Sequence, residues 1–230
     1  MSIDISCWQQ PPQTLLLAEN EVHLWRFALS TSQSNIKHLK AILSPDEGRR
    51  TDRLLDADKA EKCIVARARL RQILGKYLKH DPANLAFSYN DKGKPSLQTE
   101  HDSKLKFNLA HSGTWALLAI TTKAEIGVDL EQIDLNVDYR KIVEQFFNAG
   151  EKAEIERFTR QRQRRGFYRV WTQKEAGLKK TGFGFSTDLT TVTCNREYFF
   201  RLFPISKNYL GAIAADSEPC TIRRFKFIEE

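Results

Sequence analysis

Two acidic residues have the type and spacing for metal-assisted chemistry on a phosphate. Asp129 and Glu131 lie two residues apart in Ile126-Gly-Val-Asp-Leu-Glu131, where apolar residues alternate with them as in a half-buried strand. The alternation places both carboxylates on one face, where they repel each other unless a hard cation such as Mg²⁺ binds them. Taken alone, the pattern is also that of an exposed acidic strand end.

A third carboxylate belongs to a segment that predicts a helix, from Phe167 to a natural stop at Gly182. Trp171, Glu175 and Lys179 share one face through spacings of four residues, and Lys174 lies about 100° from Glu175. A carboxylate between two ammonium groups suits a magnesium-bound diphosphate. By itself, the helix is equally typical of a buried aromatic stripe with a solvated charged edge. Together with Asp129 and Glu131 of the predicted strand, it favours a metal and phosphate site.

The elements that position these residues repeat along the chain. One order of elements occurs twice: a strand, a short helix, a capped turn, a long helix and an apolar strand. The repeat predicts an α+β fold of two similar halves. We expect the halves to span residues 1–122 and 123–230, with the active site in the cleft between them. The paired segments are Glu21–Leu29 and Ile126–Ile133, Ser34–Leu43 and Val137–Phe147, Ser44–Glu47 and Asn148–Glu151, Ala60–Leu78 and Phe167–Lys180, and Trp115–Ile120 and Tyr209–Ala214.

Smaller features of the first half carry their own expectations. Residues 1–20 have little periodicity and predict a loose arm that packs late. In the long helix, Arg67 and Arg71 lie away from the apolar stripe. A strand from Leu105 to Ala110 is expected to end at a hinge formed by residues 111–113.

Composition is that of a soluble globular protein: 230 residues, 41% hydrophobic and 28% charged. No apolar run approaches the length of a membrane span, the N-terminus lacks a basic signal region, and four cysteines without CxxC spacing indicate reduced thiols, so we expect a cytoplasmic protein. The net charge of +7 implies an anionic partner: nucleic acid, a phosphorylated cofactor or an acidic protein. The most basic run, Arg157–Arg165, contains one aromatic residue, whereas nucleic-acid surfaces usually interleave several.

Three motifs in order resemble those of the Sfp-type 4'-phosphopantetheinyl transferases: Phe107-Asn-Leu-Ala-His-Ser112, Gly127-Val-Asp-Leu-Glu131 and Trp171-Thr-Gln-Lys-Glu-Ala-Gly-Leu-Lys179. The resemblance covers about Leu43 to Gly184. It implies transfer of 4'-phosphopantetheine from coenzyme A to a serine of an acidic acyl or peptidyl carrier protein, with release of 3',5'-adenosine bisphosphate. It also implies a monomer with pseudo-twofold symmetry and no nucleic-acid or membrane partner.

The resemblance also assigns roles to residues of this chain. Asp129, Glu131 and Glu175 would bind Mg²⁺, and Asp129, Glu175 and Lys179 would carry catalysis. The first half would bind the coenzyme A nucleotide, and the second half would carry the metal and the catalytic groups. Residues expected to bind the coenzyme A substrate are His111, Ser112, Lys94, Lys174, Lys179, Lys62 and Arg50.

Some questions stay open at the level of sequence. Ala110 and Glu47 depart from the family pattern, where a serine and a basic residue are common. Glu151 is either a helix cap or the acid that supports the metal ligands in the family. We expect the carrier protein to dock on the segment Gln132–Phe147, which borders the metal strand; the more basic run Arg157–Arg165 is the alternative. A magnesium-dependent nuclease and a basic nucleic-acid-binding module are the alternatives, and both leave Phe107–Ser112 unexplained.

Overall fold

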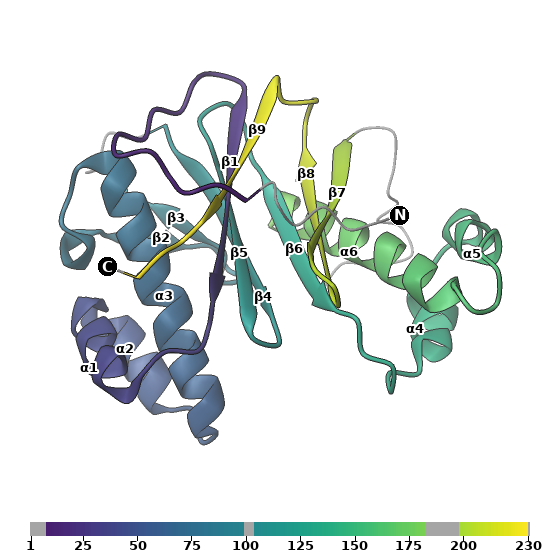
Figure 1. Ribbon diagram of the computed structural model, residues 1–230, viewed down its shortest axis with the longest axis horizontal. Helices are drawn as coiled ribbons and strands as arrows, with labels where there is room; N and C mark the ends of the chain where they lie inside the picture. Colours follow the sequence, from purple (N-terminus) through teal and green to yellow (C-terminus); the bar gives the residue numbers. More distant parts are fainter. Residues whose placement is uncertain (1–7, 99–103, 183–197, 230) are drawn as a thin grey trace.

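The computed structural model describes residues 8–98, 104–182 and 198–229. Two β-sheets pack against each other, and helices cover the outer side of each sheet (Figure 1). Helices α1, α2 and α3 lie on one side of the molecule, and α4, α5 and α6 lie on the other. The predicted α+β class is confirmed. Among the described residues, no helix has the length and apolar character that a membrane span requires.

In the first half, three α-helices follow the first strand in the chain and precede the other strands. Its elements are β1 (Glu21–Ala28), α1 (Gln33–Ile42), α2 (Pro45–Asp52), α3 (Ala57–Leu78), the 3-10 helix η1 (Pro82–Asn84), β2 (Phe87–Tyr89), β3 (Pro95–Leu97), β4 (Lys106–Ser112) and β5 (Trp115–Thr121). The second half repeats the order with β6 (Gly127–Gln132), α4 (Tyr139–Phe146), α5 (Ala149–Glu156), α6 (Gln163–Thr181), β7 (Phe199–Ser206) and β8 (Tyr209–Ala215), followed by β9 (Thr221–Lys226).

The two sheets pair their strands in the same order. The first runs β4-β5-β1-β9 and the second runs β7-β8-β6, so β1 pairs antiparallel with β5 as β6 does with β8. Strands β2 and β3 pair with each other in a separate two-stranded sheet. The last strand, β9, crosses back and pairs parallel with β1, so residues 221–226 lie in the sheet of the first half. The sequence does not predict this pairing, because β9 lies far from β1 along the chain and has no counterpart among the repeated segments.

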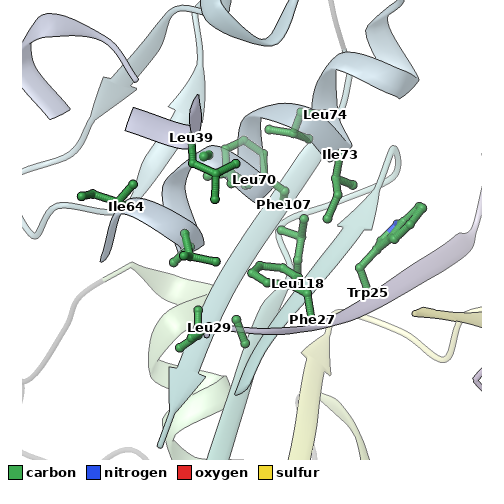
Figure 2. Packing of buried hydrophobic residues seen from close by; sticks show 14 of the residues in the cluster. Trp25, Phe27, Leu29, Leu39, Ile64, Leu70, Ile73, Leu74, Phe107 and Leu118 are labelled. Carbon is green, nitrogen blue, oxygen red and sulfur yellow. The ribbon is translucent and has the colours of Figure 1, made fainter. Parts of the chain in front are cut away.

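The main core of the first half lies between its sheet and its helices. Trp25 and Phe27 from β1, Leu118 from β5, and Leu70 and Leu74 from α3 pack together there (Figure 2). The opposite face of β1 packs against the second sheet, where Val22 and Leu24 meet apolar residues of β6, β7 and β8. Strand β1 therefore buries both faces, and its neighbour β5 is buried along nearly its whole length.

Helix starts predicted from the sequence are confirmed in detail. Ser44 and Glu47 form a capping box at the start of α2, and Asn148 and Glu151 form one at the start of α5, with both reciprocal hydrogen bonds present in each. Gly182 ends α6 with a φ of 73°. These features depend on a few neighbouring residues, which is why the sequence alone suffices to predict them.

Of three local predictions, the end of the strand Leu105–Ala110 is wrong, and those for Arg71 and the N-terminal arm are incomplete. Arg71 is buried at 1% exposure, because its guanidinium pairs with Glu47 of α2 and donates to the carbonyls of Pro82 and Leu85. Strand β4 continues through Ser112, and the turn falls at Gly113, which alone takes a positive φ there. The arm is anchored at Trp8, which is 5% exposed, while residues 1–7 lie outside the described part.

Candidate active site

Two carboxylates of the predicted site stand on β6, and the third stands on α6. Val128 and Leu130 belong to the apolar cluster between the sheets, which leaves Asp129 on the face toward α6. Asp129 is 2% exposed and Glu175 is 5% exposed. The helix approaches closely because Gly127 has no side chain: a Cβ there would lie 1.9 Å from the carbonyl oxygen of Ala176. The predicted division of this strand into an apolar and an acidic face is confirmed.

The carboxylates are close enough to suppress one another's ionisation. Burial and the Asp129 charge raise the pKa of Glu131 to about 7, and the same two causes raise the pKa of Glu175 to about 7. Asp129 Oδ2 and Glu175 Oε1 are buried, and neither has a hydrogen-bond partner among the described residues. Buried acceptors without donors are costly, and a cation satisfies them.

In residues 8–98, 104–182 and 198–229, no group of three or more His, Cys, Asp and Glu side chains is placed to hold a metal ion. One reason is that Asp129 Oδ1 already accepts a hydrogen bond from Lys179 Nζ at 2.5 Å. The donor set nevertheless fits Mg²⁺, which prefers carboxylate oxygens.

Glu131 is held in place from two directions. The indole N–H of Trp171 on α6 donates to Glu131 Oε1 at 2.9 Å, and the hydroxyl of Ser112 on β4 donates to Oε2 at 3.4 Å. Ser112 also accepts a hydrogen bond from the backbone N–H of Gln132 at 3.0 Å. Because β4 belongs to the first half, Ser112 joins both halves at the acidic cluster.

Lys179 connects the acidic cluster to an open cavity. Burial opposes its charge, but the Asp129 carboxylate outweighs burial and raises the pKa of the Lys179 ammonium, which therefore stays protonated. The side chain is 34% exposed, so a ligand in the cavity can reach it. The cavity has a volume of about 270 Å³. Its walls come from both halves and are formed by Cys63, Ala66, Arg67, Lys92, Gly93, Lys94, Pro95, Asn108, Leu109, His111, Leu178, Lys179 and Gly182.

Basic groups dominate the polar lining of this cavity. His111 lies on β4, and burial together with the charges of Lys179 and Arg67 lowers its pKa, so the free protein holds a neutral imidazole there. Lys94 Nζ donates to Glu125 Oε2 at 2.9 Å and to the carbonyl of Lys180 at 2.9 Å, which ties the β2–β3 hairpin to the end of α6. A phosphate entering the cavity meets Lys179, Arg67 and His111.

Two residues assigned to the nucleotide pair with acidic side chains, although the charge of Lys62 acts on His111. Lys62 Nζ pairs with Asp58 at 2.6 Å, and Arg50 pairs with Asp46 at 2.9 Å while its guanidinium lies over the ring of Tyr89. Neither belongs to the lining of the cavity.

Sequence reasoning did not assign Arg67 and Cys63 to the site, although both line the cavity. Their separation of four residues on α3 places them on one face of the helix. The position of Arg67 off the apolar stripe was the feature of the sequence that could have indicated its place in the cavity.

The two lysines of the α6 motif do not converge. Lys174 Nζ donates to both carboxylate oxygens of Glu151, at 2.7 and 3.0 Å, and the Lys174 side chain is 1% exposed. It lies over the ring of Phe147 and does not line the cavity. The expectation of two ammonium groups around Glu175 is therefore met by Lys179 alone in this structure, because α5 provides Lys174 with a buried partner.

The two candidate docking surfaces form one hollow. A depression of about 330 Å³ is lined by residues of both segments: Val137, Asp138, Tyr139, Arg140, Arg160, Gln161 and Arg164. Arg164 donates to the carbonyls of Asp134 and Val137, and its guanidinium lies over the ring of Tyr139. Aromatic contacts link this basic hollow to the site, since Tyr139 packs on Phe167, which stacks on Trp171.

Two family models match consecutive parts of the chain. Residues 28–123 match a model described as 4'-phosphopantetheinyl transferase, N-terminal, and residues 125–208 match one described as the 4'-phosphopantetheinyl transferase superfamily. Both matches include parts of the cavity wall, and the second includes all three carboxylates.

Curated relatives agree with the family models. The chain is 37% identical over 178 residues to the 4'-phosphopantetheinyl transferase HetI of Nostoc sp., a match that covers 77% of this chain and 75% of that relative. It is 35% identical over 162 residues to a putative 4'-phosphopantetheinyl transferase of Synechocystis sp., covering 70% and 66%. To the 4'-phosphopantetheinyl transferase Sfp of Bacillus subtilis it is 26% identical over 161 residues, covering 69% and 68%.

Proposed function

The chain belongs to the 4'-phosphopantetheinyl transferase superfamily and is a transferase enzyme, and we propose that its donor is coenzyme A and its acceptor a serine of an acyl or peptidyl carrier protein. The reaction would require Mg²⁺ and release 3',5'-adenosine bisphosphate. One observation carries the proposal: an acidic cluster with two unsatisfied buried oxygens adjoins, through Lys179, a basic cavity built by both halves.

The residues present fit a divalent cation. Asp129, Glu131 and Glu175 would hold Mg²⁺, because each is buried or half-buried, and burial together with the Asp129 charge raises the pKa of Glu131 and of Glu175. When bound, the ion would neutralise the diphosphate and stabilise the charge that develops on the transferred phosphate. Trp171 and Ser112 keep the Glu131 oxygens in place, which limits the reorganisation that binding needs.

The cavity residues suit the nucleotide end of coenzyme A. Arg67, Lys94 and His111 offer positive charge and N–H donors to the 3'-phosphate, and a bound phosphate favours protonation of His111. Lys179 lies between the cavity and the carboxylates, where it can bind the diphosphate. The serine hydroxyl would give its proton to a carboxylate of the acidic cluster as its oxygen bonds to the β-phosphorus and the bond to the bridging oxygen breaks. Lys179 would stabilise the negative charge on the departing adenosine bisphosphate.

We further propose that the carrier protein docks on the basic hollow. Arg140 and Arg160 come from different segments yet line one depression, with Asp138 as the acidic residue of the lining. Positive charge there complements an acidic helix and speeds its encounter. Charge reversals Arg140→Glu and Arg160→Glu should each raise the KM for the carrier severalfold and leave coenzyme A binding unchanged, whereas Lys37→Glu on α1, at the opposite end of the molecule, should do neither (Figure 1). Equal effects of all three reversals would place docking elsewhere.

The activity is tested by adding coenzyme A and an apo carrier protein and measuring the intact mass of the carrier. We expect a gain of one phosphopantetheine group with Mg²⁺ and none with EDTA. The family matches oppose the nuclease and nucleic-acid-binding alternatives, and isothermal titration separates them directly: coenzyme A should bind, and a DNA duplex should not. Since one chain supplies both walls of the cavity, we also expect a monomer. The cytoplasmic location stays a prediction.

A further inference from the structure

One kind of buried ion pair occurs in both halves of the chain. Glu151 is the third residue of α5 and completes a capping box, and its carboxylate also accepts from Lys174 on α6. Glu47 is the third residue of α2 and completes a capping box, and its carboxylate also accepts from Arg71 on α3 at 2.7 Å. All four side chains are at most 6% exposed.

The two pairs occupy equivalent positions. Arg71 and Lys174 each lie eight residues before the left-handed C-cap of their helix, which is Lys79 in α3 and Gly182 in α6. The strands beneath the helices have the same register. Trp25 of β1 pairs with Leu118 of β5, and Asp129 of β6 pairs with Ala212 of β8. Leu118 and Ala212 are each the fourth residue of their strand.

The first half lacks every carboxylate of the acidic cluster. At the positions of Asp129 and Glu131, β1 carries Trp25 and Phe27, which belong to the apolar core. Gln72 follows Arg71, whereas Glu175 follows Lys174. The ion pair is therefore present in a half that offers neither metal ligands nor a diphosphate site at the equivalent place. Its presence there has to have a structural cause.

We infer that Lys174 and Glu151 are positioning residues that lock α5 onto α6 and thereby fix Glu175 beside Asp129, and that Lys174 does not bind phosphate. Lys174 gives hydrogen bonds to both oxygens of Glu151, and Phe147 covers the ammonium group at 5.5 Å. Moving Lys174 to a phosphate would leave the buried Glu151 carboxylate without its cation, which is strongly unfavourable. The helix segment next to Glu175 is thus held to α5 by a contact that does not line the cavity.

Three variants separate a positioning role from a phosphate-binding role. Glu151→Gln keeps the capping box, since glutamine also serves at the third position, but leaves Lys174 charged and unpaired. Lys174→Met removes the ammonium group that pairs with Glu151, and the double variant, with both substitutions, removes both charges. Each single change should lower the Tm, on the order of 10 °C, and the double variant should recover most of that loss. An unchanged Tm in both single variants would contradict the inference.

Ligand binding supplies the second readout. The Kd for coenzyme A without Mg²⁺ should stay within about twofold of wild type in the double variant, because no phosphate contact is lost. A loss of about tenfold or more, as for a charge-assisted contact, would return Lys174 to the phosphate site. The Kd for Mg²⁺, titrated into protein saturated with coenzyme A, should rise severalfold in Glu151→Gln as Glu175 shifts.

Glu47→Gln is the matched control in the first half. It should lower the Tm as Glu151→Gln does, since Arg71 loses its buried partner, yet leave the Kd for Mg²⁺ unchanged. Equal Mg²⁺ affinity in both glutamine variants would overturn the positioning role. The ligand readouts depend on the proposed function, whereas the Tm pattern does not. Failure of wild-type protein to bind coenzyme A would therefore refute the function, and the unfolding data would still decide the ion pair.

Discussion

Gly127→Ala tests whether the contact between β6 and α6 sets the geometry of the site. A Cβ at this position would lie 1.9 Å from the carbonyl oxygen of Ala176 and 2.5 Å from the backbone nitrogen of Lys180. Both are helix backbone atoms, so no side-chain rotation relieves the clash. Real Cβ contacts essentially never fall below 3.0 Å, so α6 has to move away from β6 by at least about 1.1 Å.

The movement predicts two separate losses. Overpacking of this kind costs about 1–3 kcal/mol, or a Tm decrease of about 2–12 °C for a chain of this size. Glu175 and Lys179 belong to α6, so they move with the helix and shift relative to Asp129 by a similar distance. A misplacement of about 1 Å in an active site lowers turnover about 100-fold. Activity should therefore fall by much more than the fraction of folded protein.

Thermal unfolding and steady-state transfer to an apo carrier measure the two losses. Gly48→Ala is the control, because nothing lies within 4 Å of a Cβ there and alanine favours the α2 helix. That variant should match or slightly exceed the wild-type Tm and keep full activity. Wild-type Tm and wild-type turnover in Gly127→Ala would refute the close contact and the positioning of the site that follows from it.

Three further predictions concern single groups of the site. In EDTA, the pKa of about 7 for Glu175, against 4.5 when unfolded, means that the folded state holds a proton that the unfolded state releases, so the Glu175 contribution to stability should fall by about 3 kcal/mol as the pH rises from about 5 to 8. The raised pKa of Glu131 adds a slope of the same sign, and the lowered pKa of His111 adds one of the opposite sign. Both are shared with the variant Glu175→Gln, in which stability should fall less steeply with pH than in wild type. Trp171→Phe keeps the aromatic packing but removes the donor to Glu131, so Mg²⁺ affinity by titration should fall about 5–10-fold with little change in Tm; an unchanged affinity would show that the indole N–H does not position Glu131. His111→Ala should weaken binding of coenzyme A about tenfold and hardly affect the analogue without the 3'-phosphate; equal losses for both ligands would contradict contact with that phosphate.

The carboxylates of the site could be predicted from sequence because their patterns are local. Alternation along residues 126–131 separates Asp129 and Glu131 from the apolar face whatever the rest of the fold does, and a spacing of four joins Glu175 to Lys179 on any helix. The capping boxes at Ser44 and Asn148 are equally local. These features are correct in the structure for the same reason.

What the sequence could not supply depends on contacts between distant segments. The direction of Lys174 is decided by Glu151 on another helix, and the burial of Arg71 is decided by Glu47. The strand β9 joins β1 from the far end of the chain, and the three-residue strands β2 and β3 are too short for periodicity to identify. Arg67 enters the cavity because the β2–β3 hairpin and β4 close around α3.

The most direct test of the central claim is a Mg²⁺ titration of phosphopantetheine transfer by wild-type protein and by Asp129→Asn. Asparagine keeps the size of the side chain and removes one charged oxygen of the acidic cluster. Wild-type transfer should rise with Mg²⁺ to saturation, and the variant, at an unchanged fold by circular dichroism, should show about 100-fold lower transfer or more at the same Mg²⁺ concentration. Transfer at the wild-type rate by Asp129→Asn, or by wild-type protein in EDTA, would contradict the assignment of this cluster as the metal site.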